Sequence, residues 1–397
     1  MKKHIRLFIL VSVVAFALGV SSPYISEWFT TPDTPTASSN LPVITEEDTA
    51  PIQTDAFSLN LLKAALTAQP QGNIILAPNS LAALMGSISE LTSPAISDEI
   101  KKLGIAENLQ NSAANVSEAT ALFADPAANL NPMLAEQYVF PVPMARNRAE
   151  ACMHINNLVR SFLGNEVGNV ANSDTVPTNA SLLALCGLNY TAEWASPIIP
   201  KNTSSTEFMN ADGGRPVIRM LQAQDVLTAS SEGAWQAAAI RLSRAPMATK
   251  ENPDCYLILL MPTEDSNVRS LAGSLTAEEF NNIRTRLRQA SGGSAIKFPR
   301  LSFSTHLQNM QPTLRRLGTQ MLFASPTPFS KLTAKSPYPL TALYQVNHII
   351  MKESENAEAP LNSAPPCDIT FSRPYLWFIM PLSSGRAPHA MGLVEVL

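Results

Sequence analysis

Residues able to do chemistry are sparse along this chain, and their spacing forms no known catalytic motif. The sequence has no P-loop, no dinucleotide-binding glycine motif, no nucleophile elbow and no zinc-protease helix motif. The histidines are also far from one another: His4, His154, His306, His348 and His389. We therefore expect no enzyme, no metal site and no cofactor.

The four cysteines give no redox or zinc pattern either, because no two of them are close in sequence. Cys186 and Cys255 lie in apolar, strand-like runs and are expected to be small core residues. Cys367 lies in a polar segment and is expected near the surface. Cys152 is the fourth, and spacing alone does not pair any of them.

The polar segment that holds Cys367 is the most unusual stretch of the chain. It reads ESENAEAPLNSAPPCDITF, Glu353 to Phe371, and contains acids, small residues and three prolines between two strand-like runs. Such a composition is typical of a surface connection. Whether the segment does more depends on the elements that position it.

The body of the chain is large enough to bury a substantial core. The whole chain has 397 residues, of which 45% are hydrophobic, and a net charge of −4. The body has no cluster of Lys and Arg, so nucleic acid is not an expected partner. Helical patterns come first and antiparallel-type strand patterns dominate later, which predicts a single α+β domain.

The N-terminus predicts export. Basic residues in the first six positions precede an uncharged apolar run, Leu7 to Val20. That run has the length of a signal peptide and is short for a membrane span. We expect residues 1–22 to be a signal peptide or an N-terminal membrane anchor, with a possible tether through residues 7–20. The protein would then be secreted, extracellular or periplasmic, or held at a membrane.

A linker and a folded body are expected after this leader. Residues 23–54 are rich in Pro, Thr and Ser and predict a flexible linker. The folded domain is expected over residues 55–397. Its first helix should begin at Thr54 or Asp55, either of which is a suitable cap. ASLLALCGLNY, residues 180–190, predicts a central strand buried on both faces.

The order of segments in the body resembles the serpin family, the serine protease inhibitor superfamily. GNIILAPNSLAALM resembles an early strand that leads into the second helix, and INNLVRSFLGNEVGNV resembles a helix lying across the main sheet. Trp194 matches a tryptophan at the top of that sheet, and FSRPYLWFI with MGLVEV resembles the closing strand pair. The resemblance implies three mostly antiparallel β-sheets, about eight or nine helices and an exposed reactive-centre-type loop.

The resemblance also gives the polar segment a role, as the bait loop at residues 353–370. An inhibitory member offers this loop to a serine-type or cysteine-type endopeptidase and then inserts the cut loop into its main sheet. The implied bait bond involves Asn362, Ser363 and Ala364, whose small side chains would suit an elastase-like or subtilisin-like protease. The implied hinge is Glu355, Asn356, Ala357, Glu358 and Ala359.

Three departures keep a second function open. Asn356 replaces the hinge glycine of the family, and Pro360 lies where the inserting strand would continue. From Ala357 to Ser363 there are six steps, about 20 Å of strand. The alternative is a non-inhibitory serpin-fold binding or surface protein.

The stretch from Leu103 to Pro126 is short for the family, so a heparin-like cofactor is not implied. We expect the protein to be a monomer and a divergent family member of the bacterial type.

Overall fold

A five-stranded sheet and a nine-stranded sheet dominate the computed structural model, and helices pack on both of them. The structure describes residues 53–105, 116–178, 180–243, 254–264, 266–354, 366–383 and 387–397. All of these residues lie in one compact unit, Thr49–Leu397. The expected leader and all but the last two residues of the expected linker lie outside the described residues.

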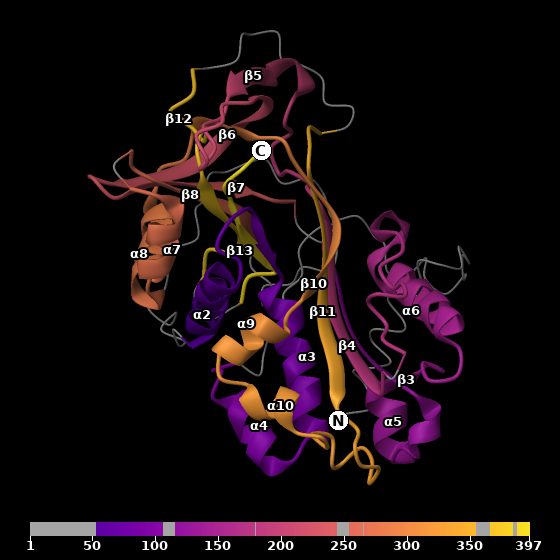
Figure 1. Ribbon diagram of the computed structural model, residues 1–397. Coiled ribbons are helices and arrows are strands. Elements are labelled where there is room, and N and C mark those ends of the chain that lie inside the picture. The colour runs from indigo at the N-terminus through magenta and orange to yellow at the C-terminus, as the bar shows by residue number, and fades with distance from the viewer. Residues whose placement is uncertain are drawn as a thin grey trace, which may run out of the picture. The chain divides into compact units, whose positions relative to one another are not determined.

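Nine α-helices occur in the described part of the chain (Figure 1). They are α2 (Gln53–Ala68), α3 (Pro78–Leu91), α4 (Pro94–Lys101), α5 (Pro132–Tyr138), α6 (Arg148–Leu163), α7 (Val268–Ser274), α8 (Ala277–Gln289), α9 (Gln311–Arg316) and α10 (Gln320–Ala324). The longer helices follow local signals. For example, Pro78 opens α3, and the Thr276 and Glu279 side chains form a reciprocal capping box at the start of α8.

The five-stranded sheet has the order β10-β11-β4-β2-β3, and its longest ladder joins β11 to β4. Its strands are β2 (Val116–Ala124), β3 (Val139–Pro141), β4 (Leu182–Thr191), β10 (Leu301–Asn309) and β11 (Leu340–Met351). β4 pairs with β11 in parallel and with β2 antiparallel. The first seven residues of β4 are all buried, so the prediction of a central strand buried on both faces is confirmed.

The second sheet follows the order β1-β14-β13-β8-β7-β6-β9-β12, with β5 paired to β6. Its strands are β1 (Ile74–Leu76), β5 (Ser204–Glu207), β6 (Val217–Ser231), β7 (Trp235–Arg241), β8 (Cys255–Pro262), β9 (Ser294–Pro299), β12 (Ile369–Thr370), β13 (Tyr375–Pro381) and β14 (Ala390–Val394). The early part of β6 pairs with β5 and β9, and its last residues pair with β7. The register of β6 with β9 shifts between Ala223 and Val226, beside Asp225, whose φ is +56°. Because β6 pairs with strands on both sides of this point, two of the three expected sheets form one continuous sheet.

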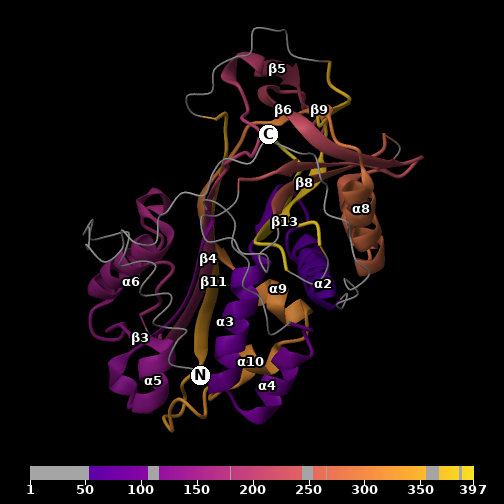
Figure 2. The ribbon, with the colours of Figure 1, turned by 180° about the vertical axis from the view of Figure 1, so that it is seen from behind.

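Two layers of helices enclose the five-stranded sheet. α6 contacts β2 and β4 from one side, and α3 contacts the same strands from the other. Figures 1 and 2 show β4 and β11 running between these two helices in opposite views. Beyond the ends of β4 and β11 lie β5, β6 and β9 (Figure 2). The main hydrophobic core lies between the α3 side of this sheet and the second sheet.

The start of the first helix differs from the expectation. α2 begins at Gln53, so Asp55 lies inside its first turn and is not the residue that precedes the helix. The Asp55 carboxylate forms an ion pair with Arg284 of α8, and both side chains are buried. Burial raises the pKa of Asp55 despite the opposing effect of the Arg284 charge. This pair fastens the beginning of the folded domain to α8.

Candidate functional site

The polar segment connects β11 of the five-stranded sheet to β12 of the second sheet. The predicted bait residues, the predicted hinge residues and Pro360 all lie outside the described residues. The bait residues are Asn362, Ser363 and Ala364, and the hinge residues are Glu355, Asn356, Ala357, Glu358 and Ala359. The structure describes the two roots of this segment, which end at Ser354 and begin again at Pro366. The site is therefore built from these roots and the sheet beside them.

The first root follows β11 and is fixed by hydrogen bonds to the chain beyond β4. The Trp194 indole Nε1 donates to the carbonyl of Lys352 at 2.9 Å. The Ser354 amide donates to the Ile198 carbonyl at 2.8 Å, and the Ile198 amide donates to the Ser354 hydroxyl oxygen at 2.9 Å. Trp194 itself is buried and packs edge-on against Phe298 of β9. The exit of the segment from β11 is thus held in one position.

Glu353 adds an ionic fastening to this root. Its Oε1 accepts from the Thr203 hydroxyl at 3.1 Å and from Arg219 Nη2 at 3.0 Å, and its Oε2 lies 3.5 Å from Arg300 Nη1. The Glu353 side chain is 9% exposed, whereas those of Arg219 and Arg300 are 57% and 41% exposed.

The partners of Glu353 favour its ionised form. Partial burial acts to raise the pKa of this carboxyl. A backbone hydrogen bond, the Arg300 charge, the Thr203 hydroxyl and the Arg219 charge together outweigh burial and lower the pKa below its ordinary value. The ionised form of Glu353 is therefore favoured at neutral pH.

The second root is fixed to β9. The Asp368 amide donates to the Ala295 carbonyl at 2.7 Å, and the Ala295 amide donates to Asp368 Oδ2 at 2.9 Å. β12 then pairs with β9 in parallel. Cys367 is half-buried, and this burial raises the pKa of its thiol against the opposing charge of Lys297. The first root also lies near β9, because Arg300, a partner of Glu353, directly follows that strand.

The five-stranded sheet offers a parallel seam beside the first root. Residues Leu340 to Ile350 of β11 pair with Leu182 to Thr191 of β4. A chain that leaves the end of β11 and turns back along the sheet would run antiparallel to β11. Because β4 runs parallel to β11, the returning chain would be antiparallel to both neighbours and could form regular ladders with each.

Buried polar side chains hold the seam to β1 and to the start of α3. The Gln345 amide accepts from the Ala77 amide at 3.0 Å and donates to the Ala77 carbonyl at 3.1 Å. Asn347 Nδ2 donates to the Ile75 carbonyl at 3.2 Å. Cys186 also faces Gln345, and burial raises the pKa of its thiol to about 12. Cys186 and Cys255 are buried core residues, as predicted.

Sequence reasoning did not find most of these contacts. Glu353 and Arg219 are 134 positions apart, and no local pattern connects them. The same holds for His389 and Glu118, 271 positions apart, where Nδ1 of the buried imidazole lies 3.1 Å from the carboxylate. His154 has a nearer acid, Glu150, at 3.6 Å on the surface of α6, a helical pair that its spacing does reveal.

The described residues contain no group of three or more His, Cys, Asp or Glu that could hold a metal ion. All four cysteines are free thiols. Over the same described residues, no helix combines the length and the apolar character needed to cross a membrane.

Comparison with known proteins decides the family. The family model described as "Serpin (serine protease inhibitor)" matches residues 110–394, well over half of the chain. The chain belongs to the serpin family. The resemblance noted in the sequence is therefore confirmed, as is the α+β serpin fold. Members of this family are generally protease inhibitors and not enzymes. No curated protein sequence matches the chain.

Solved serpin structures share this fold at low identity. Native protease nexin-1 with heparin is 18% identical, with a TM-score of 0.70 over 87% of this chain and 99% of its own. Serine protease inhibitor (Serpin)-12 of Manduca sexta is 18% identical, with a TM-score of 0.69 over 87% and 98%. Uncleaved ovalbumin is 14% identical, with a TM-score of 0.72 over 87% and 99%. These likenesses establish the fold of this serpin.

Proposed function

We propose that this protein inhibits serine-type endopeptidases by presenting residues 353–370 as a bait loop and inserting the cut loop between β4 and β11. The single observation that carries the proposal is the placement of the first root. Ser354 and Glu353 fix the start of the loop at the end of the β4–β11 seam that lies after Thr191 and Met351, and a strand returning from there would be antiparallel to both neighbours.

The fixed root also changes the length of strand available. Counted from Ala357, the stretch up to Ser363 spans about 20 Å. Counted from the residue after Ser354, Glu355 to Ser363 is eight steps, or about 27 Å of strand. β4 has 10 residues, so its nine steps span about 31 Å. A bait bond at Ser363 would thus bring the inserted strand close to the far end of the seam.

The chemistry at the bait bond follows from proteolysis. The hydroxyl of the protease serine attacks the Ser363 carbonyl, the Ser363–Ala364 bond breaks, and the Ala364 nitrogen leaves as an amine. Insertion of the strand that ends at Ser363 would separate the ester from this amine. Attack at the neighbouring Asn362–Ser363 bond follows the same course. The small side chains favour elastase-like or subtilisin-like enzymes, and the inhibitor would act as a monomer.

Pro360 favours a second candidate function. Proline lacks the N–H that a strand with neighbours on both sides must donate, so its insertion leaves one ladder bond unmade. A loop that is cut but does not insert would give a serpin-fold binding or surface protein with no trapping activity. The same loop thus fits either function. The two functions differ in whether a covalent conjugate with the protease forms.

The N-terminal run suggests where either function would operate. We propose that the chain is exported, and that residues 7–20 are either removed with a signal peptide or kept as a membrane tether. The Pro-, Thr- and Ser-rich residues 23–54 would then space the inhibitor from the membrane. Its target would be a protease outside the cytoplasm, including one of the bacterial envelope.

The test is a search for a covalent conjugate. The purified chain is incubated with elastase-, subtilisin-, trypsin- and papain-like proteases, followed by denaturing gels and intact mass spectrometry. We expect a detergent-stable adduct whose mass equals the protease plus the cleaved chain up to Ser363, less one water. The variant Ala364→Pro places a proline nitrogen at the leaving position and should abolish the adduct at Ser363, whereas an adduct at Asn362 would persist. Complete cleavage with no adduct from any protease would support the non-inhibitory alternative.

A further inference from the structure

Gly187 lies in the middle of β4, opposite Val346 of β11. Glycine is unfavourable inside a central strand unless another group approaches closely. Here a Cβ added to Gly187 would lie 2.4 Å from the Val346 carbonyl oxygen and 3.1 Å from Cδ1 of Leu163 in α6. The first distance is shorter than real Cβ contacts allow, and its partner is backbone, which cannot rotate away. The closed seam therefore requires a residue without a side chain at this position.

The C-terminal end of α6 covers the same point. Asn189 of β4 donates from Nδ2 to the Leu163 carbonyl at 2.6 Å. The Leu163 side chain is buried and reaches the space above Gly187 that a side chain there would occupy. Gly187 thus permits two close approaches together, that of β11 from the side and that of α6 from above.

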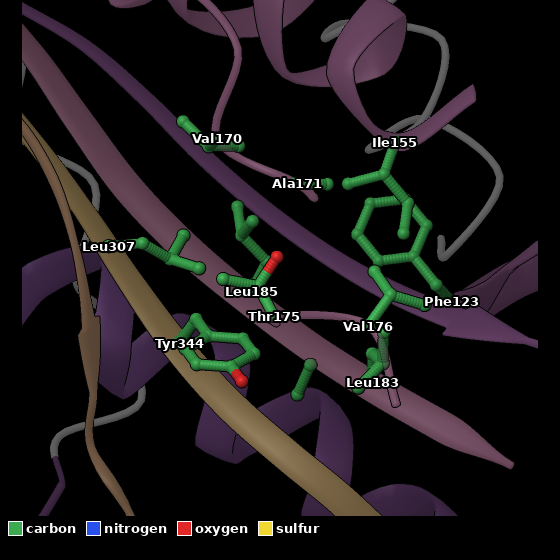
Figure 3. A pocket seen from close by; sticks show the side chains of 11 residues that line it. Phe123, Ile155, Val170, Ala171, Thr175, Val176, Leu183, Leu185, Leu307 and Tyr344 are labelled. Carbon is green, nitrogen blue, oxygen red and sulfur yellow. The ribbon is translucent and has the colours of Figure 1, made fainter. Parts of the chain in front are cut away.

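Packing beside this point is loose. A cavity of about 20 Å³ lies on the α6 side of the sheet, where Leu185 of β4 and its register partner Tyr344 of β11 both line it (Figure 3). Ile155 of α6 and the chain at Val170 to Val176 close it from the other side. Its lining is apolar, so the cavity has no polar partners with which to hold a water molecule. The seam is therefore packed tightly at Gly187 and less tightly two register pairs away, at Leu185 and Tyr344.

We propose that the absence of a side chain at Gly187 is what allows β4 and β11 to pair closely, and we call this its closing role in the seam. Any side chain at this position would then shift the sheet from its closed arrangement toward one in which β4 and β11 are apart. An added strand would move β4 and β11 apart and remove the conflict with the Val346 carbonyl. This link to loop insertion rests on the proposed function, whereas the effect on the closed sheet does not.

The first test compares Gly187→Ala with Gly86→Ala in the full chain. Gly86 lies on the exposed face of α3, and a Cβ there meets nothing within 4 Å. Amide hydrogen exchange is measured by mass spectrometry for peptides covering residues 182–191 and 340–351. We expect Gly187→Ala to speed exchange there by about tenfold or more and to lower Tm by about 3–4 °C. Gly86→Ala should leave seam exchange unchanged, and unchanged exchange in Gly187→Ala would overturn the proposal.

The second test adds a synthetic peptide of residues 355–363. We expect Gly187→Ala to take up the peptide faster than the wild type and to recover its lost Tm. Uptake by the wild type that is no faster in the variant contradicts the proposal. Faster seam exchange with no uptake by either protein supports the closing role of Gly187 and contradicts the inserting loop of the proposed function.

A third arm covers the case in which Gly187→Ala does not fold alone. The variant is then refolded with the peptide, and separately in combination with Leu163→Ala, which removes the second close contact. Recovery of a cooperative transition in either case supports the proposal. Failure in both means that the substitution disrupts more than the closed seam, and the proposal is then wrong.

Discussion

The substitution Glu353→Gln removes the charge that fastens the root of the proposed bait loop and keeps the shape of the side chain. The lost interactions are those of one carboxylate with Arg219, Arg300 and the Thr203 hydroxyl. Both guanidinium groups are about half exposed and stay hydrated after the change. We therefore expect no penalty from an unpaired buried charge, only the loss of the favourable contacts themselves.

The magnitude follows from these contacts. Each partly exposed ion pair contributes about 0.5 kcal/mol, and the charge-assisted hydrogen bond from Thr203 adds about 1 kcal/mol. The free energy of unfolding should fall by about 2 kcal/mol in total. A unit of roughly 345 residues has an unfolding entropy near 0.7 kcal/mol/K, so Tm should fall by about 3 °C.

The effect of Glu353→Gln should depend on pH in one direction. Because the folded pKa of Glu353 lies below its unfolded value, its stabilisation is fully present above the unfolded carboxyl pKa of about 4.3. The stabilisation disappears as pH falls through the folded pKa. The two proteins should therefore differ in Tm at pH 7 and become equal in acid below that folded pKa.

Calorimetry at pH 7 and through the acid range measures this difference, with Glu207→Gln as the matched control. Glu207 is exposed on β5, and its substitution makes the same change of charge a short distance away. Loop cutting by dilute subtilisin gives a second readout, since a released root should be cut faster. Equal Tm values for wild type and Glu353→Gln at pH 7, or a difference that persists in acid, would refute the assigned role of this carboxylate.

Three further changes test the packing around the site. Asp55→Ala leaves the buried Arg284 charge without its carboxylate partner, so we expect a loss of about 3–5 kcal/mol and a Tm drop of about 4–7 °C by calorimetry; adding Arg284→Met should restore most of it. Val176→Ile adds a methylene at the cavity beneath α6 and should raise Tm by about 1 °C, whereas a fall would mean that the cavity cannot take it. Because burial raises the pKa of Cys367, its alkylation at pH 8 should be slower than that of a free cysteine peptide, and equal rates would contradict the half-buried root.

The sequence predicts the elements of this serpin better than it predicts their contacts. β4 and β13 could be identified because apolar residues fill short runs between turn signals, and both strands are almost wholly buried. α8 could be identified from an amphipathic pattern behind a threonine cap. These signals are local, since each depends on neighbouring residues of one element.

Other features have no local signal. KNTSSTEF reads as a surface loop, yet Ser204–Glu207 forms β5, because the edge of β6 supplies its hydrogen-bond partners. Asp55 has the residue type of a helix cap, and its pairing with Arg284 of α8 arises from tertiary packing alone. Gly187 lies inside a run that predicts one continuous strand, and only the approach of Val346 and Leu163 explains the glycine at this position. Contacts over hundreds of positions cannot be derived from the spacing of residue types.

The bait loop illustrates the same division. Its composition and its place before the closing strands come from the sequence, whereas the position of its root comes from Trp194, Ile198 and Glu353 in three dimensions. In the proposed insertion, the root decides how much chain is available. Moving it from Ala357 to the residue after Ser354 lengthens the available strand by about 7 Å.

Thermal unfolding before and after loop cleavage tests the central claim most directly. The loop is cut with a small amount of subtilisin or elastase, the cut site is located by mass spectrometry, and both forms are scanned at pH 7. A nine-residue strand inserted between β4 and β11 adds ladder bonds on both edges, which should raise Tm by about 5–10 °C. A cut at Ser363–Ala364 with an unchanged or lower Tm would show that the loop stays outside the sheet and would contradict inhibition by insertion.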